Sequence, residues 1–174
     1  MSDPGITVEI GPTLMSLAPH FELPDHKKQL QTVETLSGSN GLILGFTRDI
    51  WLPDSVRRIL WLVHNARSFS RMGYGVGLII CNPAHSLAGF QMTSAPEGDF
   101  VLLADAEKQA YRSYGMLIYS GLVLIDSHQL VREKWLIPEE RVWPKPQEVF
   151  AAIQNIEQGM ASNPRFNATD GRAS

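Results

Sequence analysis

Two uninterrupted apolar segments, residues 41–46 (GLILGF) and 76–81 (VGLIIC), most constrain how this chain can fold. Short apolar runs of this kind are typical of strands buried on both faces of a sheet. Between them, from residue 54 or 55 to about residue 71, apolar residues recur at the spacing of a helix. These residues are Val56, Ile59, Leu60, Val63 and Ala66. The order strand, helix, strand predicts an α/β protein.

The remaining segments extend this pattern. Residues 21–25 and 30–36 indicate a short N-terminal hairpin, and residues 86–91 a helical turn. Segment 100–104 predicts a strand, 106–114 a helix, and 121–126 with 130–136 a second hairpin. A closing helix is expected over about residues 147–158. We therefore expect a thioredoxin-like fold, with a mixed central β-sheet flanked by helices and an N-terminal hairpin.

Length and composition limit the class of protein. The chain has 174 residues, 44% of them hydrophobic, enough for one well-buried core. We expect a single domain over residues 1–158 and a mobile polar tail over residues 159–174. The formal charge of -3, without a basic block, argues against nucleic-acid binding. No segment approaches the roughly 18 apolar residues of a spanning helix, and the N-terminus lacks a signal-peptide pattern, so a cytoplasmic protein is expected.

The junction between the first buried strand and the first helix, residues 46–55 (FTRDIWLPDS), is where this layout places a reactive group. A cysteine at a helix N-terminus has a lowered pKa and becomes a reactive thiolate. Ser55 stands at this junction instead. A serine hydroxyl stays protonated and becomes a nucleophile only beside a general base. We expect Ser55 to cap the helix or to donate a hydrogen bond.

Several segments, over about residues 11–157, resemble the alkyl hydroperoxide reductase C and thiol-specific antioxidant (AhpC/TSA) family of peroxiredoxins. They are residues 18–25 (APHFELPD), similar to the family's AP-x-F-x-LPD; the strand into Phe46; residues 103–105 and 110–115 (LAD and AYRSYG), similar to its LSD and AYG; and residues 121–126. In this family a cysteine thiolate attacks a peroxide, positioned by a threonine and an arginine. The resemblance implies a thioredoxin-like fold, antioxidant oxidoreductase ancestry and a homodimer.

Carried onto this sequence, the family's threonine falls on Leu52, its proline on Pro53, its cysteine on Ser55 and its arginine on Ser120. Only the proline matches. Compared with the thioredoxin Trp-Cys-x-x-Cys motif, residues 51–55 keep Trp51 and lose both cysteines. We therefore predict a family member without its peroxidase thiol and without a cofactor, retained for binding or assembly.

A vacant active site of this kind is expected to hold an anion, a small molecule or a partner at the start of the first helix. The candidate pocket residues are Arg48, Pro53, Ser55 and Ser120. The arginines near the junction, Arg48, Arg57 and Arg58, could hold an anion, but solvated side chains paired with acids such as Asp49 and Asp54 are favoured. The four tryptophans, at positions 51, 61, 135 and 143, are expected in the core or an interface.

An antioxidant enzyme that uses Cys81, or an unrecognised group, with an external thiol is the alternative. Cys81 is the chain's one cysteine, which excludes an intramolecular disulfide. At the end of a buried strand we expect a core or rim residue without catalytic duty, and otherwise a redox-sensing thiol.

Histidines give little support to other chemistry. A serine hydrolase is disfavoured because the G-x-S-x-G elbow is absent. His64 lies nine residues after Ser55 in the same helix, about 13 Å along the axis at ~1.5 Å per residue. His20 stays open as a partner of Ser55. His85 and His128 lie in turns without ligand spacing, so no metal site is expected.

Overall fold

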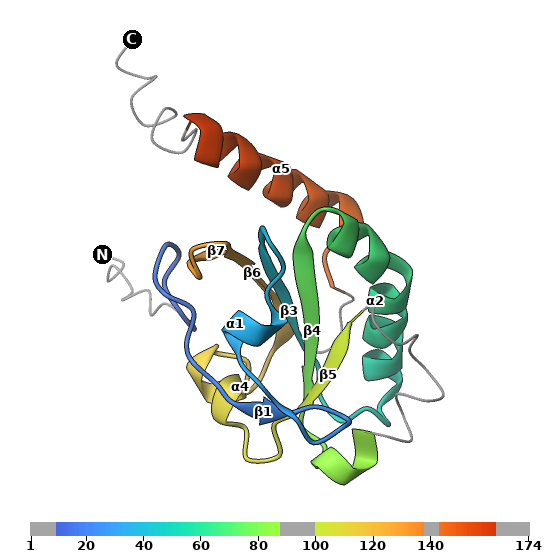
Figure 1. The fold of residues 1–174 in the computed structure, drawn as a ribbon. Helices are drawn as coiled ribbons and strands as arrows, with labels where there is room; N and C mark the ends of the chain where they lie inside the picture. The colour runs from blue at the N-terminus through green and yellow to red at the C-terminus, as the bar shows by residue number, and fades with distance from the viewer. Residues whose placement is uncertain (1–9, 88–99, 138–142, 163–174) are drawn as a thin grey trace, which may run out of the picture. The chain divides into compact units, whose positions relative to one another are not determined.

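The computed structural model describes residues 10–87, 100–137 and 143–162. Its central feature is a five-stranded sheet in the order β5-β4-β3-β6-β7 (Figure 1). The strands are β3 (Gly41–Phe46), β4 (Tyr74–Ile80), β5 (Val101–Ala104), β6 (Ser120–Asp126) and β7 (Val131–Ile137). The pairs β3–β4 and β4–β5 are parallel, whereas β3–β6 and β6–β7 are antiparallel. The predicted strands and the mixed α/β sheet are confirmed.

Short elements and helices connect these strands. β1 (Leu23–Pro24) and β2 (Leu30–Gln31) form the predicted N-terminal hairpin. α1 (Val33–Leu36) occupies the last part of segment 30–36, which was expected to belong to the hairpin, because Thr32 caps a helix there in a reciprocal capping box with Thr35. α2 (Pro53–Arg71) joins β3 to β4, and η1 (Ala84–Ser86) follows β4. α4 (Gln109–Ser113) lies between β5 and β6. Residues 88–91 of the predicted helical turn lie outside the described residues.

Contacts within the chain separate two compact units, Met1–Trp143 and Pro144–Ser174. The second unit contains α5 (Pro146–Ser162), so the predicted closing helix extends past residue 158. The expected division into a domain and a polar tail at that residue stays a prediction. Residues 163–174 of that tail lie outside the described residues. Among the helices that the structure describes, none is long and apolar enough to cross a membrane.

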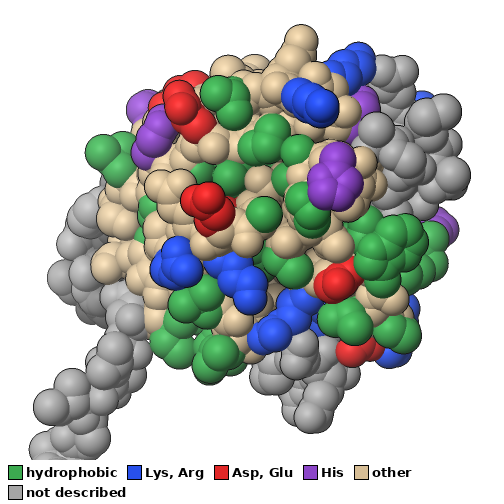
Figure 2. Space-filling view, turned by 90° about the horizontal axis from the view of Figure 1, so that it is seen from below, with side chains coloured by type: hydrophobic (Ala, Val, Ile, Leu, Met, Phe, Trp, Pro, Cys, Tyr) green, Lys and Arg blue, Asp and Glu red, His purple; other side chains and the backbone are tan. Residues whose placement is uncertain are grey.

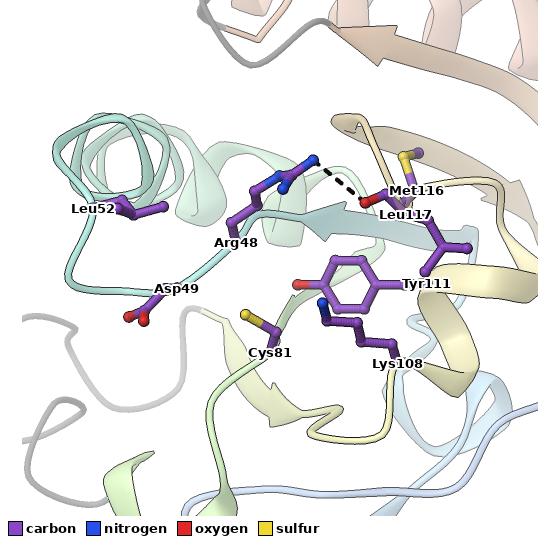
Figure 3. Close-up of a pocket in the computed structure, with 8 residues that line it drawn as sticks. All are labelled: Arg48, Asp49, Leu52, Cys81, Lys108, Tyr111, Met116 and Leu117. Atoms are coloured by element: carbon purple, nitrogen blue, oxygen red, sulfur yellow. Dashed lines mark hydrogen bonds between the residues drawn. The ribbon is translucent and has the colours of Figure 1, made fainter.

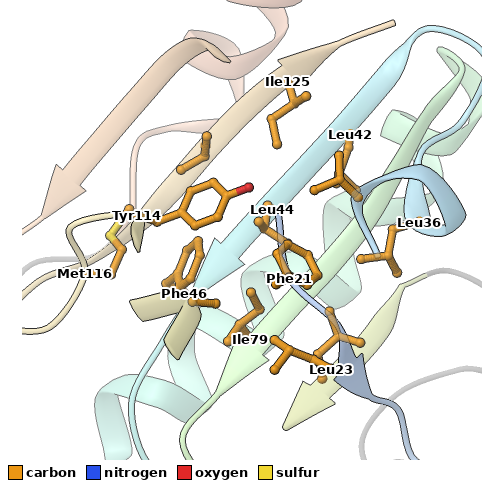
Figure 4. Close-up of a cluster of buried hydrophobic side chains, with 14 of the residues drawn as sticks. Phe21, Leu23, Leu36, Leu42, Leu44, Phe46, Ile79, Tyr114, Met116 and Ile125 are labelled. Carbon is orange, nitrogen blue, oxygen red and sulfur yellow. The ribbon is translucent and has the colours of Figure 1, made fainter. Parts of the chain in front are cut away.

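One face of the sheet is covered by the hairpin, α1 and α4 (Figures 1 and 4). Side chains alternate along β3, so that Leu42, Leu44 and Phe46 all point to this face. Phe46 lies between two tyrosines of the α4 segment, with ring centroids 5.5 Å from Tyr111 and 5.2 Å from Tyr114. This cluster fixes the α4 segment against the end of β3, which is where the sequence placed the candidate site.

The other face is covered by α2, which packs on β4. The side chains it buries include Ser55, Arg58, Ile59, Leu62, Ala66 and Phe69. Val56 is 42% exposed and Leu60 48% exposed, whereas Arg58 is only 1% exposed. The expectation that Val56 and Leu60 face the core and that Arg58 is solvated is therefore wrong. The first turn of α2 faces polar groups at the end of β3, so polar side chains are buried there.

Candidate functional site

Helix α2, which follows β3, begins one or two residues earlier than expected. Pro53 is the first helical residue, where its missing N–H leaves no bond unmade. Leu52 occupies the N-cap position and makes no side-chain cap. Asp54 lies in the first turn, where a negative charge suits the helix dipole, and it forms an exposed ion pair with Arg57, as predicted. Ser55 therefore does not cap the helix, and that expectation is wrong.

Ser55 is instead part of a buried polar chain. It has no exposed surface, and its Oγ accepts a hydrogen bond from Thr47 Oγ1 at 3.0 Å. Arg58 Nη1 donates in turn to Thr47 Oγ1 at 3.4 Å. Thr47 lies directly after β3 and is itself buried. The hydroxyl of Ser55, the residue predicted to match the family's cysteine, is thus hydrogen-bonded inside the protein rather than presented to solvent.

Ser120, which was predicted to match the family's arginine, is also held inside the protein. Its Oγ donates to the carbonyl oxygen of Phe46 at 2.7 Å and accepts from Trp143 Nε1 at 3.0 Å. Trp143 is buried and meets the half-buried Trp61 edge-on, with ring centroids 5.6 Å apart, so Trp143 lies in the core as expected. The Trp143 ring also fills the space beside Gly45, where a Cβ would lie 2.7 Å from a ring carbon. Ser120 therefore positions Trp143 on the sheet.

A cavity of about 180 Å³ opens beside this junction, where β3 and β4 end (Figure 3). Four segments supply its walls: the loop after β3, the residue after β4, the start of α4 and the loop before β6. The lining residues are Arg48, Asp49, Leu52, Cys81, Lys108, Tyr111, Met116 and Leu117. Of the predicted pocket residues, Arg48 lines this cavity, and Pro53, Ser55 and Ser120 are not among its lining residues.

The charged groups of the cavity are two cations and one carboxylate. Arg48 Nη2 donates to the carbonyl oxygen of Leu117 at 3.3 Å, which joins the loop after β3 to the loop before β6 (Figure 3). Lys108 has a left-handed backbone, with φ 59°, and an exposed side chain. Asp49 accepts hydrogen bonds from the Trp51 N–H and the Asn82 side-chain amide, which lower its pKa. The ionic side chains that line the cavity therefore carry a net positive charge.

Cys81 lies on the wall of this cavity and is partly buried (Figure 3). Burial raises the pKa of its thiol, and the carboxylate of Asp49 raises it further. Lys108 and Arg48 act in the opposite direction but do not cancel these effects. Since only the thiolate is nucleophilic, Cys81 is mostly in its unreactive form at neutral pH.

Tyr111 closes the inner end of the cavity. Its hydroxyl donates toward the carbonyl oxygens of Thr47 and Ile79, the ends of two parallel strands. Burial raises the pKa of Tyr111 well above that of a free phenol, and Cys81 adds to this, so the hydroxyl stays protonated and donates. Sequence reasoning missed Tyr111 and Lys108 as site residues, although residues 110–115 carried a family-like pattern.

Histidines do not gather at this site. His64 lies in α2 with Nδ1 2.7 Å from the Leu60 carbonyl oxygen, within its own helix. His20 is exposed, whereas Ser55 is fully buried and bonded to Thr47. Over residues 10–87, 100–137 and 143–162, no group of three His, Cys, Asp or Glu side chains is arranged as metal ligands would be.

Comparisons with known proteins agree with this fold. The structure is similar to a peroxidoxin from Mycobacterium tuberculosis, at 19% identity and a TM-score of 0.66, over 81% of this chain and 94% of that one. It is similar to a thiol peroxidase from Chromobacterium violaceum, at 19% identity and a TM-score of 0.67, over 85% and 91% of the two chains. A reduced 2-Cys peroxiredoxin from Plasmodium vivax gives 18% identity and a TM-score of 0.70, over 86% and 85%.

At these identities the solved structures show the fold, which is thioredoxin-like, as predicted. No curated protein matches the chain significantly. The model of the AhpC/TSA family matches residues 15–134, well over half of the sequence. That range contains β3, the start of α2, Cys81 and the whole of the cavity lining. The chain therefore belongs to the AhpC/TSA family.

Proposed function

We propose that this protein does not reduce peroxides at the family's cysteine position and instead binds a small anionic molecule in the cavity where β3 and β4 end. One observation carries the proposal. The residue at the cysteine position, Ser55, is a fully buried hydroxyl bonded to Thr47, while the accessible cavity nearby contains Arg48 and Lys108.

The loss of peroxide chemistry is supported by three replaced groups. Peroxide reduction needs a sulfur that is oxidised to a sulfenic acid, and a serine hydroxyl cannot take that step. Leu52, at the threonine position, has no side-chain hydrogen-bond donor. Ser120, at the arginine position, is neutral and already bonded to Phe46 and Trp143. These three replacements argue against peroxide reduction at Ser55.

Binding of an anion is supported by the charges of the cavity. A guanidinium and an ammonium group both line it, and hydrogen bonds from charged donors to anionic oxygens are about twice as strong as neutral ones. Asp49, the opposing carboxylate, is engaged by Trp51 and Asn82. An anion thus meets two cationic donors and a carboxylate that already accepts hydrogen bonds from the loop after β3 and from Asn82, after β4.

Two measurements test this proposal. With dithiothreitol as reductant, the purified protein should consume hydrogen peroxide no faster than its Cys81→Ser variant. Acetate should bind to the protein in an NMR titration, and Lys108→Met should weaken that binding. Arg71→Met, which removes a cation from the last turn of α2, is the matched control and should leave it unchanged. Equal acetate binding by Lys108→Met and the unaltered protein contradicts an anion site in the cavity.

A second candidate is a thiol-dependent antioxidant enzyme that uses Cys81, because its sulfur lines the same cavity as Arg48 and Lys108. The Cys81 thiolate would attack one oxygen of a hydroperoxide, breaking the O–O bond to give a sulfenic acid and an alcohol. Two external thiols would then reduce the sulfenic acid to the thiol and water, forming a disulfide. Peroxide consumption that is lost in Cys81→Ser would favour this candidate over the binding protein.

Assembly and location are separate proposals. The family resemblance implies a homodimer, and Val56 and Leu60 leave apolar surface exposed along α2. Sedimentation of the purified protein tests for a homodimer. The Leu60→Ser variant should shift the protein toward monomer. A cytoplasmic location stays a prediction and can be checked by fractionation.

A further inference from the structure

We infer that the ligand of this cavity is an amphipathic monocarboxylate, with its carboxylate beside Arg48 and Lys108 and its apolar body across the exposed rim. This inference rests on the proposed function and names the chemical class of ligand. It follows from three features of the same site: its charge, its size and the side chains at its mouth.

The charge of the cavity suits a single negative charge. Arg48 and Lys108 contribute two positive charges, and Asp49 contributes one negative charge. A singly charged carboxylate balances the remaining positive charge, whereas a doubly charged phosphate exceeds it. A carboxylate can also take two parallel hydrogen bonds from a guanidinium group, which matches the chemistry of Arg48.

The size of the cavity means that it can enclose only part of an organic ligand. Its volume is about 180 Å³, below the roughly 300–1,000 Å³ of pockets that enclose drug-sized molecules. The apolar side chains of its wall include Met116, which is buried, and the ring of Tyr111. The carboxylate and the first few carbons fit inside, and a longer body must lie over the mouth.

The mouth of the cavity is apolar on two sides. Leu52, before α2, and Leu117, before β6, both line the cavity and are both exposed. Their sequence neighbours extend these surfaces outward, since Trp51 is 71% exposed and Ile118 69% exposed. Seen from the end of the molecule where β3 and β4 finish, basic and hydrophobic side chains lie next to one another (Figure 2). An apolar body placed here removes exposed apolar surface from water, which favours binding.

Three probes of different design separate the parts of this inference. Acetate carries the charge alone, 1-octanol the apolar chain alone, and octanoate carries both. NMR titrations at neutral pH, with octanoate kept below micelle-forming concentrations, should give octanoate at least tenfold tighter binding than either of the others. The reason is that each buried methylene adds to affinity and only octanoate also reaches the two cations.

Variants test which residues bind the carboxylate of the ligand and which bind its apolar chain. Leu117→Ser should weaken octanoate at least fivefold and leave acetate unchanged, because it shortens the apolar rim and keeps the backbone carbonyl that Arg48 contacts. Lys108→Met should weaken octanoate and acetate alike. Leu30→Ser, an exposed leucine of β2 that does not line the cavity, is the matched control and should change neither.

Each outcome decides one claim. If acetate binds as tightly as octanoate, the amphipathic ligand is wrong while the anion site of the proposed function stands. If 1-octanol equals octanoate, the role of the cations is wrong. If neither acid binds, both the inference and the proposed anion site fail. Binding of peptides that end in an apolar residue, without octanoate binding, overturns the inference in favour of a protein partner.

Discussion

The hydrogen bond between Thr47 and Ser55 should be a measurable part of this protein's stability. Replacing Ser55 by alanine leaves the buried Thr47 hydroxyl without the acceptor that it has at 3.0 Å. An unsatisfied buried donor costs about 1–3 kcal/mol, so we expect a loss of about 2 kcal/mol in the free energy of unfolding. For a chain of this length that corresponds to a fall in Tm of roughly 4–8 °C.

Urea unfolding of four proteins tests this expectation: the unaltered chain, Ser55→Ala, Thr47→Val and the double variant. If the two hydroxyls interact, the double variant should lose about 1 kcal/mol less than the sum of the single losses. Ser70→Ala, an exposed serine of the same helix, is the control and should change stability by less than about 0.5 kcal/mol. Additive losses, or no loss in Ser55→Ala, would refute the structural role of Ser55 and leave its hydroxyl available for chemistry.

Four further measurements test other parts of the site. Ser55→Cys should restore little hydrogen peroxide reduction, because residue 55 is fully buried; rapid turnover in a coupled assay would contradict this. Alkylation of Cys81 by iodoacetamide should be slow at neutral pH and should speed up as pH rises, since its pKa is raised and only the thiolate reacts. Asp49→Asn removes a charge that raises this pKa and should accelerate alkylation at a given pH; a slower reaction would show that the carboxylate acts otherwise. Ser120→Ala should lower stability by about 1–3 kcal/mol, because Trp143 loses its acceptor, and an unchanged Tm would argue against that bond.

Most of the fold could be predicted because the pattern of apolar residues determines which segments are buried. The run over residues 41–46 pairs on both sides, with β4 and β6, and every one of its residues is buried. A strand in that position must be apolar throughout, and this signal is local in the sequence.

The polar interior of the junction could not be predicted in the same way. Helical spacing predicted Val56 inside and Arg58 outside, whereas the structure has the reverse. The reason is Thr47, which follows the preceding strand and is hydrogen-bonded to both Ser55 and Arg58. Periodicity reports hydrophobic burial and contains no information on which buried hydroxyl a helix will meet.

The cavity was missed for a related reason. Arg48 and Cys81 follow different strands and become neighbours only because β3 and β4 are parallel and adjacent. Lys108 directly precedes α4 and Tyr111 lies in it, and the position of this helix depends on packing against Phe46. Single residues such as Arg48 could be named from the sequence, but their shared cavity required the register of the sheet.

The position of Tyr111 has a consequence for how this protein can respond to a ligand. Its hydroxyl spans the ends of β3 and β4, and the Thr47 N–H donates to the Ile79 carbonyl oxygen beside it. The back wall is thus cross-linked by hydrogen bonds and should hardly move. Adjustment to an incoming molecule is then left to the loop after β3. Slow amide hydrogen exchange at Thr47 and faster exchange at Trp51 would show a rigid back wall and a mobile loop at the cavity entrance.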